Sequence, residues 1–348
     1  MICHCSLRTF ETSVRWFGRT ATPSPAGCFR TGMVTRGERM RGWFVLISVA
    51  ISLLAPGTVT GQTGWTEGGH QVLHGLWTNS TTTPLERPAE MGDRTLLTEA
   101  EVAALDAQAA GRNDRPPRAG DPGTYNEFWW ERGTRLRRTS LVVEPADGRI
   151  PTMTEAGRAR AAWTRGSEDW TDRNLAERCL TRGAPKRPGG YNNNFLILQT
   201  PGYVVMLQEM IHEVRIIPLD GRRHINEGIR LWMGDSRGRW DGDTLVVETT
   251  NFSEQIVFNS YNCCPGAGAN LRLVERFTRV DADRIDHRYT VEDPTTYVGP
   301  WTAAIPMTRF DGPIFEYACH ERNYGMENLL RGARVQERTA GLTSTEAK

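Results

Sequence analysis

The residues best placed to do chemistry are a carboxylate and an imidazole near the C-terminus, Glu316 and His320. Two residues four positions apart share a face whether the segment is a strand or a helix. A carboxylate beside an imidazole holds the ring in one tautomer and favours a pKa near neutrality, as a general base requires. The alternative is a partly buried histidine that is simply hydrogen-bonded to glutamate at the end of a barrel.

A second pair, Glu209 and His212, is separated by three positions. On a helix the two would share a face, but the surrounding Val and Ile residues favour a strand, in which they point to opposite faces. A bend between two strands would bring them together again. Otherwise Glu209 pairs with an arginine such as Arg215, and His212 fills an ordinary strand position.

A divalent metal would require His212, His224 and His320 to converge with a carboxylate, because a catalytic zinc ion has three protein ligands and an open position. These histidines belong to different predicted elements, so their spacing neither supports nor excludes a metal. Taken alone, His224 follows an Asp-Gly turn and is expected to be solvated.

Six residues are candidates for binding a small organic ligand, since aromatic planes with Asp and Arg suit sugars or aromatic molecules through stacking and bidentate hydrogen bonds. They are Trp232, Asp235, Arg237, Trp240, Asn251 and Tyr324. The alternative places the tryptophans in the core and uses the Asp and Gly residues of this loop for two tight turns. The chain lacks a GxSxG, Walker, dinucleotide or CxxCH signature, so the corresponding hydrolase, NTPase, dehydrogenase and haem functions have no support.

The elements that must position these residues form a predicted antiparallel β-meander over residues 191–335. Turn signals separate strands expected at 195–200, 203–208, 212–219, 244–251, 271–280, 284–291, 301–307 and 314–319. We expect this mostly β meander to close into a lipocalin-like barrel, because closure removes exposed edges. Several strands are apolar on both faces, so one face should line an interior and the other should pack under the N-terminal third.

Residues 62–190 are expected to form a cover of short helices, long loops and the first strands, in one compact domain with the meander. A capping box of Thr98 and Glu101 predicts a helix to about Ala110. Thr154 and Thr171 resemble N-caps of helices at 155–165 and 172–181. Residues 336–348 are expected to be a disordered tail.

Residues 40–61 have the pattern of a secretory signal peptide: a positive start, an apolar run from Trp43 to Ala55 and a small-residue end. The apolar run falls short of the roughly 20 residues that span a membrane. We therefore predict a periplasmic or secreted protein that begins near Gln62, with residues 1–39 a mis-assigned or disordered leader. The alternative is a genuine long leader with an uncleaved anchor.

Without residues 1–61, which hold seven Arg and two Glu, the chain has 35 basic and 39 acidic residues. The signs are mixed, which argues against binding nucleic acid or an anionic membrane surface, since both need a basic stripe. In an exported protein we expect a disulfide between Cys179 and Cys319, with two buried unpaired thiols as the alternative. Cys263 and Cys264 are either free or a vicinal disulfide.

Several motifs are similar to those of a large family of exported bacterial proteins: RIIPLDGR, WMGDSRGRWDGDTLVVETTNF, ERFTRVDAD and FEYACHERNYG. GTYNEFWW and ERCLTRG extend the resemblance over most of the mature chain. These motifs indicate membership but have no assigned activity, so the resemblance implies export and no catalytic residue.

The sequence thus supports two functions for a barrel interior that holds a small aromatic, terpenoid or sugar-like molecule. The first is an acid–base enzyme (a lyase, isomerase or hydrolase), cofactor-free or assisted by a divalent metal, that uses Glu316–His320 and Glu209–His212. The second is a binding or carrier protein of the lipocalin type without turnover. Convergence of His212, His320 and a carboxylate on one cavity would favour the enzyme, and a dry apolar cavity would favour the carrier.

Overall fold

The computed structural model describes residues 66–67, 69–113, 130–131, 133–162, 166–258, 263–321 and 323–346. The expected leader and signal peptide, residues 1–61, and the expected mature start at Gln62 lie outside these ranges. The strands are β1 Thr66–Glu67, β2 His70–Gln71, β3 Gly75–Thr78, β4 Val142–Glu144, β5 Asn194–Thr200, β6 Tyr203–Gln208, β7 Glu213–Pro218, β8 Asp235–Asp241, β9 Thr244–Thr250, β10 Arg272–Asp281, β11 Arg284–Glu292, β12 Trp301–Ala304 and β13 Met307–Arg309. The α-helices are α1 Glu99–Asn113, α2 Glu155–Ala161 and α3 Tyr324–Glu346.

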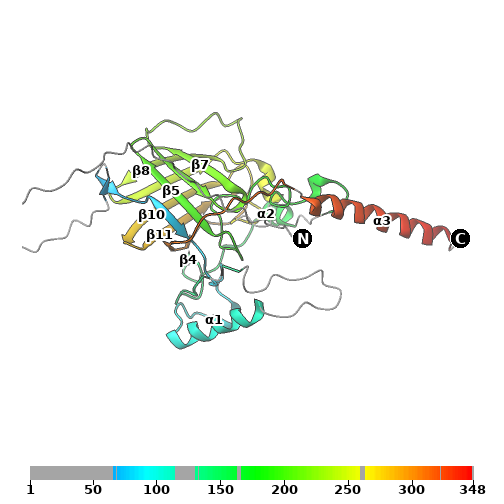
Figure 1. Ribbon diagram of the computed structural model, residues 1–348, viewed down its shortest axis with the longest axis horizontal. Helices are drawn as coiled ribbons and strands as arrows, with labels where there is room; N and C mark the ends of the chain where they lie inside the picture. Colours follow the sequence, from blue (N-terminus) through cyan, green and yellow to red (C-terminus); the bar gives the residue numbers. More distant parts are fainter. Residues whose placement is uncertain are drawn as a thin grey trace, which may run out of the picture. The chain divides into compact units, whose positions relative to one another are not determined.

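One antiparallel sheet dominates the structure and nearly closes into a barrel (Figure 1). Its main path runs β7-β6-β5-β3-β13-β11-β10-β9-β8, and β12 pairs with β11 beyond β13 and carries β4. The two end strands of the path, β7 and β8, are neighbours without a hydrogen-bonded ladder. The prediction of a mostly β antiparallel barrel is therefore confirmed.

Side chains close the seam between β7 and β8 in place of a backbone ladder. Gly238 on β8 lies so close to β7 that a Cβ atom there would come 2.6 Å from Leu219 Cδ2 and 2.8 Å from Ile217 Cγ2. Arg215 on β7 also donates from Nη2 to Ser236 Oγ on β8, at 3.2 Å. A glycine at this position lets the apolar side chains of β7 cover the gap between the two edges.

The barrel interior is divided along its length into two apolar clusters with polar side chains between them. The first cluster, which we call the barrel core, comprises Leu73, Trp77, Ile197, Val204, Met206, Ile217, Leu245, Val247, Phe277, Ile285 and Met307. The second, which we call the end cluster, includes Leu141, Val142, Ala184, Phe252, Ile256, Cys263, Cys264, Leu271, Leu273, Tyr289, Val291, Tyr297 and Trp301. Both clusters contain inward residues of β10 and β11, since alternate residues of a strand share a face.

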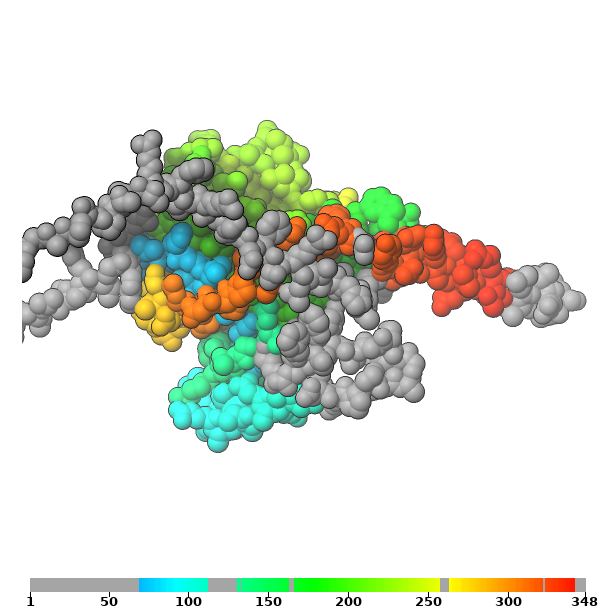
Figure 2. Space-filling model, viewed as in Figure 1, coloured from blue at the N-terminus to red at the C-terminus, as the bar shows by residue number. Residues whose placement is uncertain are grey.

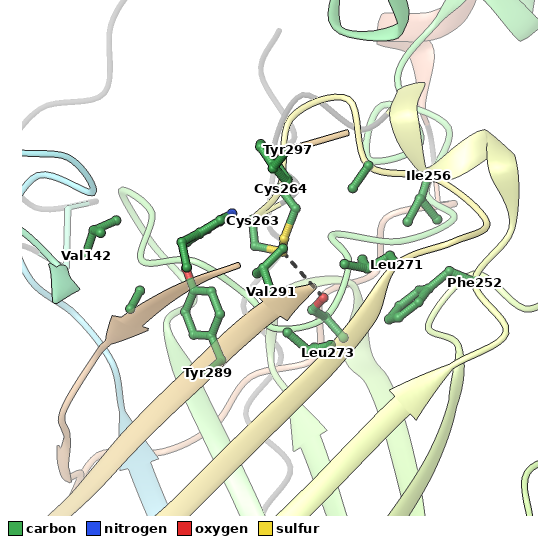
Figure 3. Packing of buried hydrophobic residues seen from close by; sticks show 14 of the residues in the cluster. Val142, Phe252, Ile256, Cys263, Cys264, Leu271, Leu273, Tyr289, Val291 and Tyr297 are labelled. Atoms are coloured by element: carbon green, nitrogen blue, oxygen red, sulfur yellow. Dashed lines mark hydrogen bonds between the residues drawn. A yellow bond between two sulfur atoms is a disulfide. The ribbon is translucent and has the colours of Figure 1, made fainter. Parts of the chain in front are cut away.

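The N-terminal cover packs over one end of the barrel and not over its outer wall. Leu141, Val142 and Ala184 contribute to the end cluster together with strand residues such as Leu273 and Val291. Figure 3 shows the Cys263–Cys264 disulfide among these side chains. Both cysteines are fully buried, so the vicinal disulfide replaces the alternative of two free thiols.

The outer wall of β5, β6 and β7 is apolar and exposed, which differs from the expected packing under the N-terminal third. Val214 and Ile216 on β7 are 53% and 61% exposed, and Leu198 and Tyr203 are also exposed. The β7–β8 connection, residues 219–234, lies on the surface as well (Figure 2, yellow-green). The apolar residues that the cover contributes, such as Leu141, Val142 and Ala184, lie in the end cluster instead.

The strand β8 was not expected, because its residues Asp235 to Asp241 were interpreted as a loop with two tight turns. As the last strand of the sheet path, β8 carries charged residues on its outer face, as edge strands commonly do. Its inner face presents only Ser236, Gly238 and Trp240, which leaves little apolar alternation in the sequence. The tight turn expected at Asp241-Gly242-Asp243 does form, and it joins β8 to β9 in a hairpin that was not expected.

Two expected elements are absent from the described chain. The described residues 310–321 contain no strand where one was expected at 314–319, and part of this backbone is bonded by a side chain instead: Phe315 N donates to Glu209 Oε1 at 2.9 Å. Residues 172–181 form turns instead of a helix, after a short 3₁₀ segment capped by Asp169 and not by Thr171. Cys179 has a φ of 57°, which ends any regular helix before it.

The predicted N-caps of α1 and α2 both form, whereas α3 was not expected from the sequence. The Thr98–Glu101 capping box forms as expected, and Thr154 accepts a hydrogen bond from Gly157 N as the N-cap of α2. The segment after residue 335, expected to be disordered, continues α3 to Glu346. Ion pairs one turn apart, Glu327–Arg331 and Arg334–Glu337, support this exposed helix. None of the helices in the described ranges is long and apolar enough to cross a membrane.

The Cys179–Cys319 disulfide is present, with a Cα–Cα distance of 5.6 Å, and it joins residues 140 positions apart. Closing so long a loop restricts the unfolded chain, so replacing both cysteines by Ser should lower the free energy of unfolding by on the order of 4–5 kcal/mol. Urea titrations followed by tryptophan fluorescence would measure the change. A reducing agent should shift the wild-type midpoint toward that of the variant, and equal midpoints for oxidised wild type and variant would contradict the prediction.

Candidate functional site

A layer of polar side chains crosses the barrel interior between the barrel core and the end cluster. Arg215 of β7, Ser236 of β8, Thr249 of β9, Glu275 of β10 and His287 of β11 belong to it, and all are at most 9% exposed. Strand alternation accounts for their position, because buried apolar residues lie two positions to either side of Glu275 and of His287. We call these five residues the polar layer.

Arg215 connects β7 to the next three strands beyond the seam. Its Nη2 donates to Ser236 Oγ at 3.2 Å, to Thr249 Oγ1 at 3.3 Å and to Glu275 Oε2 at 2.5 Å. The Ser236 and Thr249 hydroxyls are themselves hydrogen-bonded at 2.9 Å. A single guanidinium group therefore links the four strands β7, β8, β9 and β10 from inside.

Glu275 is shared between this guanidinium group and an imidazole. His287 Nε2 lies 3.3 Å from Glu275 Oε1, and its ring stacks on Phe277 with centroids 4.3 Å apart. Burial alone would raise the pKa of Glu275, but the charge of Arg215 and the hydrogen bonds from both partners outweigh it and lower this pKa to about 2. Glu275 is thus ionised at neutral pH and holds the His287 ring in one orientation.

Lys186 brings an amine to the same region from the segment between α2 and β5. Its Nζ donates to Asn193 Oδ1 at 2.8 Å, and its backbone carbonyl accepts from Asn79 Nδ2 at 2.9 Å. Burial lowers the pKa of the Lys186 amine to about 7, because a desolvated ammonium ion is costly. At neutral pH about half of this amine is therefore uncharged.

A narrow cavity joins the amine to the polar layer. Its polar lining includes Lys186, Gln208, Arg215, Glu275 and His287, and Phe195, Met206, Phe277 and Met307 supply apolar walls. The volume open to the centre of a water molecule is about 20 Å³, so the cavity has room for about one water molecule. An imidazole, a carboxylate and a partly neutral amine on one desolvated cavity form a set of groups able to transfer protons.

The two residue pairs predicted from the sequence do not meet in this interior. Glu316 and His320 are exposed on the irregular segment before α3. His212 is exposed too, and its Nδ1 lies 2.8 Å from the Tyr317 carbonyl oxygen. The expected interior site of Glu316, His320 and His212 is therefore not the arrangement that the structure shows.

Glu209 is buried, and its carboxylate accepts hydrogen bonds from one side-chain amide and one backbone N–H group and is not paired with His212 or Arg215. It accepts hydrogen bonds from Asn194 Nδ2 at 2.8 Å and from Phe315 N at 2.9 Å. Burial raises its pKa. A tight turn with Ile211 at a φ of 61° separates buried Glu209 from exposed His212, so the bend between strands forms without uniting the pair.

His224 is not solvated as expected but lies between two carboxylates. Its Nδ1 is 2.8 Å from Asp235 Oδ2, and its Nε2 is 3.4 Å from Glu248 Oε1. In the part of the chain that is described, no three His, Cys, Asp or Glu side chains are arranged to hold a metal ion. The set of His212, His224 and His320 suggested for a divalent metal is thus not assembled there.

The residues proposed to bind a ligand have structural contacts, and none of the six lines the barrel cavity. Asp235 forms an ion pair with Arg237 at 2.9 Å, and Trp240 stacks on His70 with centroids 4.7 Å apart. Asn251 donates to the carbonyls of Asn226 and Ile229, which fixes the β7–β8 connection. Trp232 is half-buried, and Tyr324 is exposed at the start of α3.

The sequence reasoning missed Lys186, Glu275 and His287, although each left a signal. Glu275 and His287 alternate with apolar residues in LVERF and IDHRY, which places them on inward faces. Lys186 is unusual by composition, because the chain contains 40 arginines and only two lysines, Lys186 and Lys348. It lies in the part of the chain that was expected to form loops of the cover, where no residue was expected to be catalytic.

Comparison with protein-family models, with curated proteins and with solved structures finds no match to this chain. The barrel is established by its own strand pairing, and the resemblance to a family of exported bacterial proteins stays a prediction. Functional inference therefore rests on the polar layer, Lys186 and the cavity between them.

The ion pair of Arg215 and Glu275 yields a prediction on stability. Arg215→Met leaves the Glu275 charge buried without a partner, so the free energy of unfolding should fall by about 3–5 kcal/mol. Arg215→Met combined with Glu275→Leu should recover most of this loss, because neither charge then remains. Arg276→Met is a matched control, since its ion pair with Asp241 is exposed and should be worth less than about 1 kcal/mol. Urea denaturation of the two single variants and the double variant measures the coupling between Arg215 and Glu275. If the two single losses of stability simply add in the double variant, the residues are not coupled and the prediction is wrong.

Burial of Lys186 yields a prediction on pH. The folded state binds this proton less tightly than the unfolded chain, in which the pKa is near 10.5, so stability should rise with pH between about 7 and 10.5. Lys186→Met lacks this titration, and the wild type should therefore gain stability relative to the variant across this window. Denaturant unfolding at several pH values measures the difference, with Lys348→Met as the control that should follow the wild type. A constant difference over the window would show that Lys186 keeps an ordinary pKa.

Proposed function

We propose that this protein is an exported enzyme that carries out acid–base chemistry on a small molecule at the barrel cavity. The observation that supports the proposal is the common lining of this cavity by Lys186, Glu275 and His287, three buried titratable groups of different types. Buried groups with shifted pKa values, such as Lys186 and Glu275, cluster at functional sites more often than elsewhere. The proposal retains the carboxylate–histidine chemistry expected from the sequence and assigns it to Glu275 and His287.

Each group has a separate role in the proposal. Ionised Glu275 orients His287 through Nε2, which leaves the other ring nitrogen to exchange a proton with the substrate. Lys186 is the second proton-transfer group, because an amine with a pKa near 7 can both accept and release a proton at neutral pH. Arg215 keeps Glu275 ionised and is a positioning residue.

The size of the cavity limits what it can take. Pockets that hold drug-sized ligands have volumes of about 300–1,000 Å³, whereas this cavity has room for about one water molecule. A carrier of the lipocalin type must enclose its whole ligand, and this cavity is too small to do so. An enzyme needs only the reacting group of its substrate to reach the three side chains, and a carbonyl or hydroxyl group is of suitable size.

Export is supported by the disulfides. Cys179–Cys319 and the vicinal Cys263–Cys264 pair account for all four cysteines after residue 61. Disulfides persist in oxidising compartments such as the periplasm and the extracellular space. Together with the signal-peptide pattern in residues 40–61, the disulfides support the proposal that the activity lies outside the cytoplasm.

The proposed function can be tested by the exchange of carbon-bound protons for deuterium in a panel of small hydroxy- and oxo-compounds, followed by proton NMR in D₂O. Wild-type protein should catalyse exchange in at least one compound. His287→Gln should reduce the rate by on the order of 10²–10⁴-fold, the usual contribution of a general acid–base group. Circular dichroism would confirm that the variant is folded.

Two further variants make this test specific. His74→Gln changes an exposed histidine outside the cavity and should leave the exchange rate unchanged. His320→Gln tests the pair that the sequence favoured. Loss of exchange in His320→Gln with full activity in His287→Gln would overturn the interior site, and absence of exchange with every compound would overturn the function.

A further inference from the structure

Primary amines are almost absent from this chain. Of its 42 basic residues 40 are arginine, and the two lysines are Lys186 and the C-terminal Lys348. Arginine supplies charge and hydrogen bonds but stays protonated, whereas a lysine shifted by burial can act as a nucleophile. Lys186 is therefore the one position in the described chain where a side-chain amine occurs, and it lies at the cavity.

The contacts of Lys186 leave its amine available for covalent chemistry. Its Nζ donates to the neutral amide oxygen of Asn193, and within the described residues no ion pair joins it to a carboxylate. The nearby carboxylate of Glu131 is engaged by the backbone N–H groups of Asn192 and Asn193, at 2.6 and 2.7 Å. The carboxylate of Glu209 is likewise occupied by Asn194 and Phe315. The amine is thus desolvated, and no carboxylate in the described part of the chain holds it as an ammonium ion.

From this placement we propose that Lys186 forms an imine with the carbonyl group of a small aldehyde or ketone, which is the substrate of the barrel cavity. The inference rests on the proposed function and names its substrate class. A buried lysine in apolar surroundings is a recognised way to obtain an amine nucleophile for carbonyl substrates. Phe195, Met206, Phe277 and Met307 provide such surroundings here.

The reaction balances without an oxidant or a reductant. The lone pair of the Lys186 nitrogen forms a bond to the carbonyl carbon as the C=O π bond breaks, and the oxygen takes up a proton as the nitrogen loses one. The C–O bond of the resulting hydroxyl group then breaks, and the group leaves as water with the second proton of the nitrogen while the C=N bond forms. His287 lines the same cavity and is placed to carry these protons, and the released water matches the size of the free space.

Reductive trapping of the full-length protein tests this proposal. The protein is incubated at pH 7 with isotopically labelled formaldehyde and cyanoborohydride, which adds hydride to an imine carbon, and the labelled residues are mapped by peptide mass spectrometry. At pH 7 an ordinary lysine is neutral in only about 1 molecule in 3,000, against about half for Lys186. We expect Lys186 to react at least tenfold faster than added Nα-acetyl-lysine and than Lys348, even though it is buried.

A size series and a variant complete the test. Trapping at Lys186 should weaken from formaldehyde to acetaldehyde and disappear with benzaldehyde, because the cavity admits only a small group. Lys186→Arg keeps the positive charge but cannot form an imine, so it should lose the fast adduct and remain folded by circular dichroism. A fast adduct that persists in Lys186→Arg, or equal trapping with benzaldehyde, would overturn the proposal.

Failure of this inference can be told apart from failure of the proposed function. If Lys186 is not trapped but exchange still depends on His287, the imine is overturned and the acid–base enzyme stands. If Lys186 is trapped, the imine proposal is supported whatever the outcome of the exchange assay. Slow labelling of Lys186 at the rate of the reference amine would overturn the imine by itself.

Discussion

Arg215 and Glu275 lie on strands that are separated by the open seam of the sheet, and their ion pair crosses the interior from β7 to β10. The same guanidinium group bonds to Ser236 and Thr249 on the two strands between them. Removing two charges from water costs several kcal/mol per ion, and their attraction repays this only with good geometry and further hydrogen bonds. The barrel provides such hydrogen bonds, because the hydroxyl groups of Ser236 on β8 and Thr249 on β9 lie within hydrogen-bond distance of Arg215. Closure of the barrel and satisfaction of the buried charges are therefore one constraint.

This constraint shapes the candidate site. The polar layer needs apolar residues on both sides to exclude water, and the barrel core and the end cluster provide them. Exclusion of water in turn lowers the pKa of the Lys186 amine, while the charge of Arg215 keeps Glu275 ionised. The same dry environment thus leaves Glu275 charged and the Lys186 amine partly neutral, since Glu275 has the counter-charge of Arg215 and, among the described residues, the Lys186 amine donates to a neutral amide.

The N-terminal cover, which is distant in sequence from the polar layer, closes one end of the barrel above it. Residues around 141 and 184 close the end of the barrel, and the Cys179–Cys319 disulfide ties the segment that carries Lys186 to the chain before α3. Glu209 adds a second tie by accepting from Phe315. The residues first favoured for catalysis, Glu316 and His320, belong to this tied segment, and their place at the surface follows from it. The segment runs over the barrel end, where its backbone is bonded by side chains and not by a neighbouring strand.

The sequence by itself determined the antiparallel meander, the capped starts of α1 and α2 and the Cys179–Cys319 pairing, because these depend on local alternation, on local hydrogen-bonding groups and on the small number of cysteines. Only the tertiary structure decided which polar residues meet. Glu275 and His287 lie on neighbouring strands, but Arg215 reaches Glu275 across a seam, and Lys186 comes from a loop about 30 positions before Arg215. Spacing along the chain contains no information on such contacts, since they depend on the register of β7 to β11 and on which end of the barrel the cover closes. For this reason His320, well spaced from Glu316, lies in solvent, while Lys186, without any motif, lies at the cavity.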